Sequence, residues 1–133
     1  MTTKDCKRQW ILTFYTPRSS LEACKAAVFA AGAGRYPEPG NYTECCWTTF
    51  GTGQYRPGDT ANPHIGTVGK LEEVEEAKVE VLCTGQEVLE QAIQGLKEAH
   101  EYEEPAYYVM KIENLENGKL PITDRTEQNR RCG

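Results

Sequence analysis

The sequence predicts an α+β domain in which a four-stranded antiparallel sheet carries two helices on one face. Four short segments are apolar or alternate between apolar and polar residues, which is typical of strands. Two longer segments repeat apolar residues at helical spacing. The resulting order, β-α-β-β-α-β, is the split βαβ arrangement of ferredoxin-like domains, and right-handed crossovers place both helices on the same face.

The first strand is expected at residues 10–15, WILTFY, and ends before Pro17. A helix should follow, because Ser19 and Glu22 have the spacing of a capping box. Glycines at 32 and 34 end this helix. Its buried stripe is expected to consist of Leu21, Cys24, Val28 and Ala31.

The second strand is expected at residues 45–50, with an extension towards Tyr55, after a Pro/Gly/Asn connection at 35–44. Residues 51–69 contain five glycines and two prolines, which predicts a long loop. A loop of this length in a compact domain is usually functional or mobile.

The third strand is expected at residues 74–82, where alternation favours a strand over the helix that LEEVEE would also permit. Thr84 and Glu87 form a second capping box and predict the start of the second helix. The last strand is expected at 106–112. The apolar stripe of the second helix consists of Val88, Leu89, Ala92, Ile93, Leu96 and Ala99.

The bulk composition excludes several classes of function. A chain of 133 residues supports one hydrophobic core, and a net charge of −5 gives no basic surface for nucleic acid. No apolar run approaches the roughly 20 residues of a membrane span, so no membrane partner is expected. The first ten residues, MTTKDCKRQW, lack the apolar stretch of a secretory signal. We therefore expect a cytoplasmic protein with a domain at 1–113 and a polar C-terminal extension at 114–133.

Six cysteines are present, and reduced thiols are expected throughout because no export signal precedes them. Cys24 and Cys83 fall on apolar faces, where a thiol behaves as a small hydrophobic side chain. The remaining cysteines are Cys6, Cys45, Cys46 and Cys132.

Several short pieces occur together in one order: AGAG, GNY, GTGQYRP, ANPHIG, VGKLEEVEE and YEEPAY. With them, residues 9–113 resemble the YqfO-type inserted domain of the Ngg-interacting-factor family, a PII/CutA-like module that interrupts a dinuclear-metal protein. The resemblance implies a ferredoxin-like fold and a tendency to form trimers. It also implies that the metal-binding halves of those proteins lie outside the matching segment. The chain departs from the family pattern at Glu44, His64 and Glu101.

The glycine-rich segment GTGQYRPGDTANPHIG is the first candidate site. Backbone amides near Gly51 and Gly53 can surround an anion, with Arg56 as its charge partner. The resemblance places this segment where PII-like proteins carry a long effector loop. The alternative is a purely structural cluster of turns that uses glycine for positive φ.

The second candidate is the run His100, Glu101, Tyr102, Glu103 and Glu104 after the second helix. A histidine beside carboxylates can bind a divalent metal or transfer protons, with His100 or Glu103 as the acid/base. The alternative is a histidine that interacts favourably with the helix C-terminus, followed by a solvated acidic turn.

Cys45, His64 and His100 form the candidate metal set, for a soft ion such as Cu(I) or for zinc. Adjacent cysteines on a strand point to opposite faces, so Cys45 and Cys46 do not bind one ion together. No CxxC or HxxxH spacing supports the metal hypothesis, and structural cysteines are favoured. The acidic run Glu72, Glu73, Glu75 and Glu76 is expected to be a solvated face or a belt of charge between subunits.

These observations favour a homotrimeric PII/CutA-like module that binds a small molecule or metal ion, or regulates, through clefts between subunits. The clefts would lie between the loop at 51–66 and the turn at 100–104. The alternatives are a small cofactor-independent enzyme (a hydrolase, lyase or isomerase) and a copper- or zinc-binding protein. The expected ligand-binding residues are Gly51, Gly53, Arg56, Asn62, His64, Tyr102 and Glu104. Strand aromatics predict that other subunits cover the free sheet face: Trp10, Phe14, Trp47, Tyr107 and Tyr108.

Overall fold

The computed structural model describes residues 8–36, 40–113 and 118–120. Their elements follow the predicted order and confirm the α+β class. The elements are β1 (Gln9–Pro17), α1 (Arg18–Ala30), β2 (Trp47–Tyr55), β3 (Glu72–Thr84), α2 (Gln86–Ala99) and β4 (Tyr107–Lys111).

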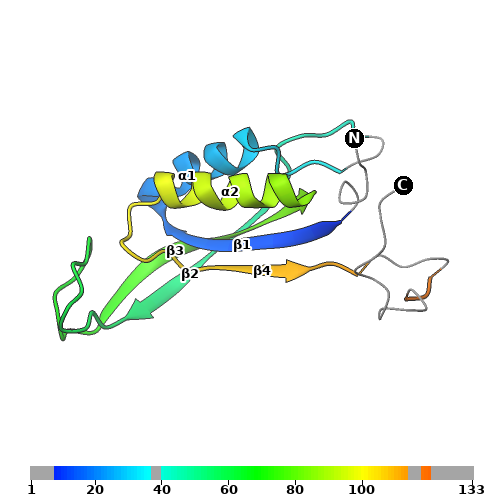
Figure 1. Ribbon diagram of the computed structural model, residues 1–133. Helices are drawn as coiled ribbons and strands as arrows, with labels where there is room; N and C mark the ends of the chain where they lie inside the picture. The colour runs from blue at the N-terminus through cyan, green and yellow to red at the C-terminus, as the bar shows by residue number, and fades with distance from the viewer. Residues whose placement is uncertain (1–7, 37–39, 114–117, 121–133) are drawn as a thin grey trace.

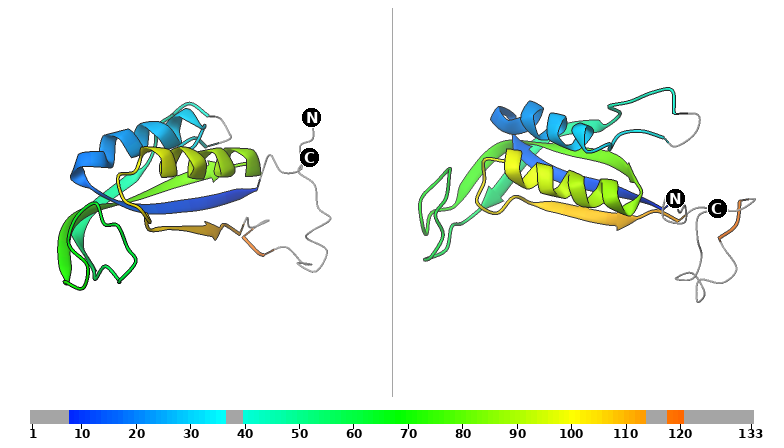
Figure 2. Two further views of the ribbon diagram at one scale, coloured as in Figure 1. Left: turned by 60° about the vertical axis from the view of Figure 1, so that its left-hand side comes forward. Right: turned by 45° about the horizontal axis from the view of Figure 1, so that its top comes forward.

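The four strands form one sheet in the order β2-β3-β1-β4, and every neighbouring pair is antiparallel. Both helices lie on the same face of this sheet, as Figures 1 and 2 show. The opposite face carries no element of the described chain and is called the open face below.

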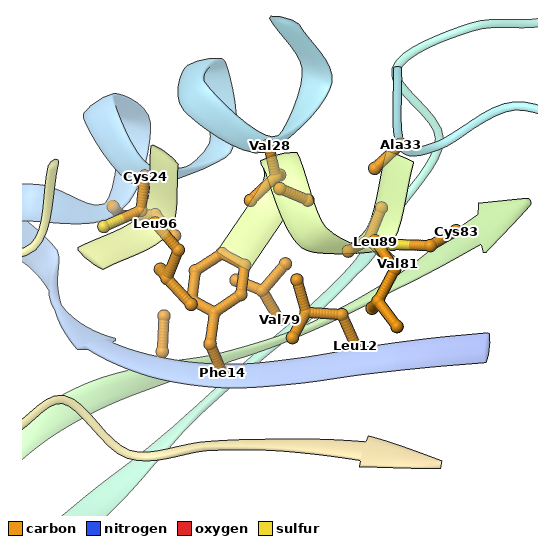
Figure 3. Close-up of a cluster of buried hydrophobic side chains, with 13 residues drawn as sticks. Leu12, Phe14, Cys24, Val28, Ala33, Val79, Val81, Cys83, Leu89 and Leu96 are labelled. Carbon is orange, nitrogen blue, oxygen red and sulfur yellow. The ribbon is translucent and has the colours of Figure 1, made fainter. Parts of the chain in front are cut away.

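The core lies between the sheet and the two helices (Figure 3). Leu12 and Phe14 of β1 face the helices and stand opposite Val81 and Val79 of β3 in the strand register. Burying each such side chain contributes about 1.5–3 kcal/mol to the fold. The helices supply a further six buried apolar side chains, which are Leu21, Cys24, Val28, Leu89, Ala92 and Leu96.

Both capping-box predictions are wrong. Pro17 is the N-cap of α1, and Ser19 lies inside the first turn, where its hydroxyl donates to Glu101 instead. Gly85, with φ of 97°, is the N-cap of α2. The Thr84 hydroxyl accepts a hydrogen bond from the side chain of Gln9. In both cases a partner distant in sequence binds the hydroxyl that local spacing assigned to the helix terminus.

The second strand takes the extension to Tyr55 and begins at Trp47 instead of residue 45, and the third strand is longer than predicted. β2 continues to Tyr55, so Gly51 and Gly53 belong to a strand and the connecting loop is 56–71. β3 begins at Glu72 because each residue from there pairs with β2. Residues 72–75 extend beyond the last partner in β1 and pair only with β2, which forms a two-stranded arm that projects beyond the helices (Figure 1).

Alternation along the strands divides the aromatic residues between the two faces. Trp10, Phe14 and Tyr107 share the helix-covered face with Leu12, which corrects their assignment to the free face. Trp47 and Tyr108 do lie on the open face, in one row across the sheet with Glu80 and Thr13 between them. The open face comprises Ile11, Thr13, Tyr15, Trp47, Thr49, Lys78, Glu80, Leu82, Tyr108 and Met110.

Four cysteines are described, and all four are free thiols. Cys24 and Cys83 are buried as predicted, and burial raises the pKa of Cys83 to about 11. Cys6, Cys132 and most of the 114–133 extension lie outside the described residues. Within the described chain, neither helix has the length and apolar character that a membrane span requires.

Candidate ligand-binding site

Loop 56–71 folds back onto the turn at 100–106 that joins α2 to β4. The backbone N–H of Asn62 donates to Glu103 Oε1 at 3.0 Å. His64 Nε2 lies 2.9 Å from Glu101 Oε2. On the other side of the loop, the Tyr55 hydroxyl donates to the carbonyl oxygen of Ile65 at 2.7 Å. The loop and the turn that the sequence analysis singled out are therefore in contact within one chain.

Glu101 links this turn to the first helix. Its Oε1 accepts hydrogen bonds from the hydroxyls of Ser19, at 2.6 Å, and Ser20. Both serines lie in the first turn of α1, where the helix dipole also favours a negative charge. The hydrogen bonds from Ser19 and Ser20 are the main causes that lower the pKa of Glu101, and His64 adds to them. Glu101 is therefore a structural anion that holds α1, the turn and loop 56–71 together.

His100 is buried and fully hydrogen-bonded. The backbone N–H of Tyr102 donates to its Nδ1 at 3.0 Å, so the proton resides on Nε2, which lies 2.7 Å from the carbonyl oxygen of Tyr15. This pair of bonds fixes the neutral tautomer. Both ring nitrogens are engaged with backbone, so His100 shapes the turn and has no nitrogen free for proton transfer to a ligand.

A cavity of about 330 Å³ lies between the β2–β3 arm, loop 56–71 and the turn at 100–106. Its volume is at the small end of the ~300–1,000 Å³ range of ligand sites. Three tyrosine rings line it, from Tyr15, Tyr55 and Tyr102, and the last two have centroids 6.1 Å apart. The cavity therefore combines aromatic walls with polar lining residues and suits a small ligand.

The charged side chains at this cavity are mostly acidic. Glu76, Glu103 and Glu104 line it, whereas Arg56 is the single lining arginine or lysine. Arg56 Nη1 donates to the carbonyl oxygen of Gly69 at 3.0 Å. Among the described residues no ion pair joins Arg56 to a carboxylate. The cavity is therefore net negative.

Two phenol groups keep their protons here. The Tyr102 hydroxyl is buried beside the Glu76 carboxylate and the Tyr55 side chain. Burial, followed by the negative charge of Glu76, raises the pKa of Tyr102. Burial, and then the charges of Glu72 and Glu76, also raises the pKa of Tyr55. Glu76 therefore exerts a negative potential on both rings.

Gly53 makes room for the Glu76 side chain. A Cβ at Gly53 would lie 2.0 Å from Glu76 Oε1, whereas a Cβ at Gly51 would have no neighbour within 4 Å. The carboxylate thus lies across the backbone of β2 where only glycine permits it. The sequence hypothesis of an anion held by amides near Gly53 does not fit this arrangement, because a carboxylate already lies there.

The structure brings together most, but not all, of the predicted site residues. Arg56, His64, Tyr102, Glu103 and Glu104 line the cavity, and Asn62 is bonded to its rim. Gly51 and Gly53 line a second, shallower depression on β2.

The predicted metal set of Cys45, His64 and His100 is not assembled. Cys45 precedes β2 and Tyr55 ends it, a separation of about 30 Å at ~3.3 Å per residue. Loop 56–71, with His64, continues from that far end. Within the part of the chain that is described, no three His, Cys, Asp or Glu side chains are grouped to hold a metal. The set fails because residues 51–55, which were predicted to belong to the loop, continue β2 and carry the chain away from Cys45.

Tyr15, Tyr55 and Glu76 are cavity residues that sequence reasoning missed. Glu76 belongs to the acidic run that the sequence predicted to be a solvated face or a belt of charge between subunits. Its position depends on the pairing of β3 with β2, which the sequence does not reveal because both segments lack strong strand character.

No protein-family model matches this chain. A protein from Mycobacterium bovis named GTP cyclohydrolase 1 type 2 homolog is 41% identical over 104 residues, which cover 78% of this chain and 26% of that protein. Its namesake from Bacillus subtilis is 36% identical over 102 residues, or 77% of this chain and 26% of that protein. The chain thus spans about a quarter of the length of the curated relatives it matches.

Solved structures identify the fold. A Bacillus cereus protein related to NIF3 matches 84% of this chain and 28% of its own, with a TM-score of 0.69 and 28% identity. The periplasmic divalent cation tolerance protein CutA from Archaeoglobus fulgidus matches 80% of this chain and 85% of its own, at a TM-score of 0.56 and 15% identity. The GlnK–ATP complex of B. subtilis matches 81% of this chain and 88% of its own, at a TM-score of 0.54 and 12% identity. The fold is therefore PII/CutA-like.

Proposed function

Because this chain corresponds over most of its length to one segment of NIF3 (Ngg1-interacting factor) family proteins, we propose that it is a homotrimeric PII/CutA-like binding module. It takes up a small molecule at clefts between subunits and acts as a regulatory or binding unit. The enzymatic activity in the relatives' name belongs to proteins about four times as long, so it is not assigned to this segment.

The observation that carries this proposal is the open face of the sheet. Trp47, Tyr108 and Met110 are 65%, 61% and 59% exposed there. Ile11 and Leu82 stand beside Met110 in the next row, and both are half-buried. Large apolar side chains gathered on one surface are typical of protein interfaces. Further copies of the chain, packed sheet to sheet, would cover these side chains.

The cavity lies at the margin of this proposed interface. Tyr15 belongs to the open face and also lines the cavity, and its ring meets that of Tyr108 edge to face at 6.2 Å between centroids. A neighbouring subunit on the open face would therefore form part of the cavity rim. This position supports a ligand site between subunits, with loop 56–71 as its wall on the chain's own side.

Catalysis and metal binding receive less support from the geometry. His100 is engaged at both nitrogens, which leaves Glu103 as the remaining acid/base candidate. Glu103 accepts the Asn62 N–H and lines the cavity, so its first role is to hold the loop. Ligand binding, unlike acid/base catalysis, requires no free proton acceptor in the cavity, so the geometry favours binding.

Size-exclusion chromatography with light scattering tests the assembly. We expect the wild-type chain at three times its 14.9 kDa mass. The double variant Trp47→Glu/Tyr108→Glu should elute as a monomer, because it puts a charge on each edge strand of the face that the proposed interface buries. Tyr42→Glu is the matched control, since Tyr42 is 76% exposed and lies outside the sheet. A monomeric wild-type protein would contradict the proposal.

A further inference from the structure

We infer that the cavity between the β2–β3 arm and loop 56–71 recognises an organic ammonium ion, held by the Glu76 carboxylate and the rings of Tyr15, Tyr55 and Tyr102. The inference rests on the proposed binding function and names the ligand class of the same site. It is carried by three features of the cavity, namely its charge, its aromatic walls and the placement of Glu76.

The charge of the cavity favours a cation. Three carboxylates line it, from Glu76, Glu103 and Glu104. Glu103 accepts a hydrogen bond from the Asn62 N–H, and Arg56, the one arginine among the described lining residues, donates to the carbonyl oxygen of Gly69. Glu76 has no ion-pair partner among the described residues. A cationic ligand would supply the missing partner, whereas an anion would face like charge.

The aromatic walls favour an organic cation over a bare metal ion. A ring face attracts a cation within about 6 Å, and sites for quaternary ammonium ions are built from several aromatic side chains. Tyr55 and Tyr102 are tilted by 59° to each other, so they form two walls rather than a stack. No described group of three His, Cys, Asp or Glu is arranged to coordinate a metal. The cavity therefore offers aromatic side chains and the Glu76 carboxylate in place of a set of metal ligands.

The Tyr102 hydroxyl lies in the wall of the cavity beside the Glu76 carboxylate, whose negative charge acts on it. A carboxylate and an aromatic ring, the two groups that attract an organic ammonium ion, are therefore neighbours in this cavity.

Glu76 is placed in the cavity by the absence of a side chain at Gly53. The distance of 2.0 Å between its Oε1 and a Cβ at Gly53 means that any other residue there displaces the carboxylate. Because the displaced group is the end of a flexible side chain, Gly53→Ala should leave the fold intact and move only the charge. Gly51, two residues earlier on the same strand and the same face, has open space at its Cβ.

Isothermal titration calorimetry on the whole chain tests the ligand class. The probes are choline and butylammonium, with 3,3-dimethylbutan-1-ol as the neutral isostere of choline and ATP as the anion. We expect either ammonium probe to bind and the neutral isostere to bind at least about tenfold more weakly, because it lacks the charge that Glu76 and the rings recognise.

Two matched pairs of variants locate the binding to this cavity. Glu76→Gln and Gly53→Ala should each weaken ammonium binding by about tenfold or more, because one removes the charge and the other displaces it. Glu73→Gln and Gly51→Ala should bind as the wild type does. Glu73 is an exposed carboxylate on the same strand that does not line the cavity, and Gly51 lies outside it. Circular dichroism of all four variants checks that each remains folded.

The outcomes separate this inference from the proposed function. A trimer that binds ATP or the neutral isostere but neither ammonium probe would overturn the ligand class and leave the binding module in place. A trimer that binds none of the four probes would also overturn the inference. Ammonium binding that is equally strong in Glu76→Gln and Gly53→Ala would show an adventitious surface site and overturn it as well. A monomer that still binds choline in a Glu76-dependent manner would instead contradict the trimer alone.

Discussion

Glu101 joins parts of the chain that are far apart in sequence. One carboxylate oxygen accepts the hydroxyls of Ser19 and Ser20 at the start of α1, and the other contacts His64 of loop 56–71. Its side chain is 20% exposed, so these contacts are only partly screened by water. Glu101 therefore helps to set where the cavity-forming loop lies, together with the Asn62–Glu103 and Tyr55–Ile65 hydrogen bonds.

We expect Glu101→Ala to lower the free energy of unfolding at neutral pH by about 1–3 kcal/mol, the range for lost hydrogen bonds to a charged group. The folded pKa of Glu101 lies below its unfolded value, so its contribution is fully present above the unfolded pKa. The contribution is lost as pH falls through the lowered folded pKa. Urea denaturation across acidic and neutral pH measures both effects.

Glu98→Ala is the control for this experiment, because Glu98 is exposed and bonded only to Gln94 on the same helix. It should change stability little at any pH. A constant difference between wild type and Glu101→Ala down to strongly acidic pH would contradict the assigned role.

The two helices meet at Gly95 of α2. A Cβ at this position would lie 3.4 Å from both the Cβ and the carbonyl oxygen of Ala27 in α1. That distance is ordinary van der Waals contact, whereas any longer side chain would enter the first helix. Close helix packing over the sheet is therefore set by a pair of small residues, Gly95 and Ala27.

Gly95→Ala should raise the free energy of unfolding by up to about 1 kcal/mol, because alanine is the better helix former and its methyl group fits. Gly95→Leu should lower it by about 1–3 kcal/mol, the usual cost of overpacking. Thermal and chemical denaturation of the two variants test whether the free energy of unfolding changes in opposite directions. Gly32→Ala is a useful comparison, since φ of 105° at Gly32 disfavours any side chain and predicts destabilisation. Equal destabilisation by Ala and Leu at position 95 would contradict the account of this contact.

At the scale of the whole molecule, the sheet has one covered face and one open face. The covered face holds the core, while the open face presents Trp47, Tyr108 and Met110 to solvent in the single chain. If subunits cover the open face, folding and assembly are linked by mass action.

The midpoint of thermal unfolding should therefore rise with protein concentration over about a hundredfold range. The Trp47→Glu/Tyr108→Glu variant should unfold at a midpoint that is independent of concentration. Circular dichroism at several concentrations measures both. A wild-type midpoint that does not vary with concentration would argue against assembly through this face.

The sequence by itself determined the order of the elements and the buried stripe of each helix. Leu21, Cys24 and Val28 are buried as predicted, and so are Leu89, Ala92 and Leu96. Apolar periodicity carries this information, because a helix must bury one face whatever its neighbours are. The importance of loop 56–71 and of the 100–104 run was also predicted, since an excess of glycine and a cluster of polar groups are visible locally.

Tertiary structure alone added Tyr15, Tyr55 and Glu76 to the cavity and removed Gly51 and Gly53 from it. The two glycines became strand residues, the Ser19 and Thr84 hydroxyls bonded away from the helix termini, and Glu76 of the acidic run came to line the cavity. Each of these outcomes depends on a partner far away in the chain, through strand register or a long-range hydrogen bond. The spacing of residues along the chain does not reveal such partners. The fold could therefore be predicted from the sequence, whereas the positions of Tyr15, Tyr55 and Glu76 in the cavity could not.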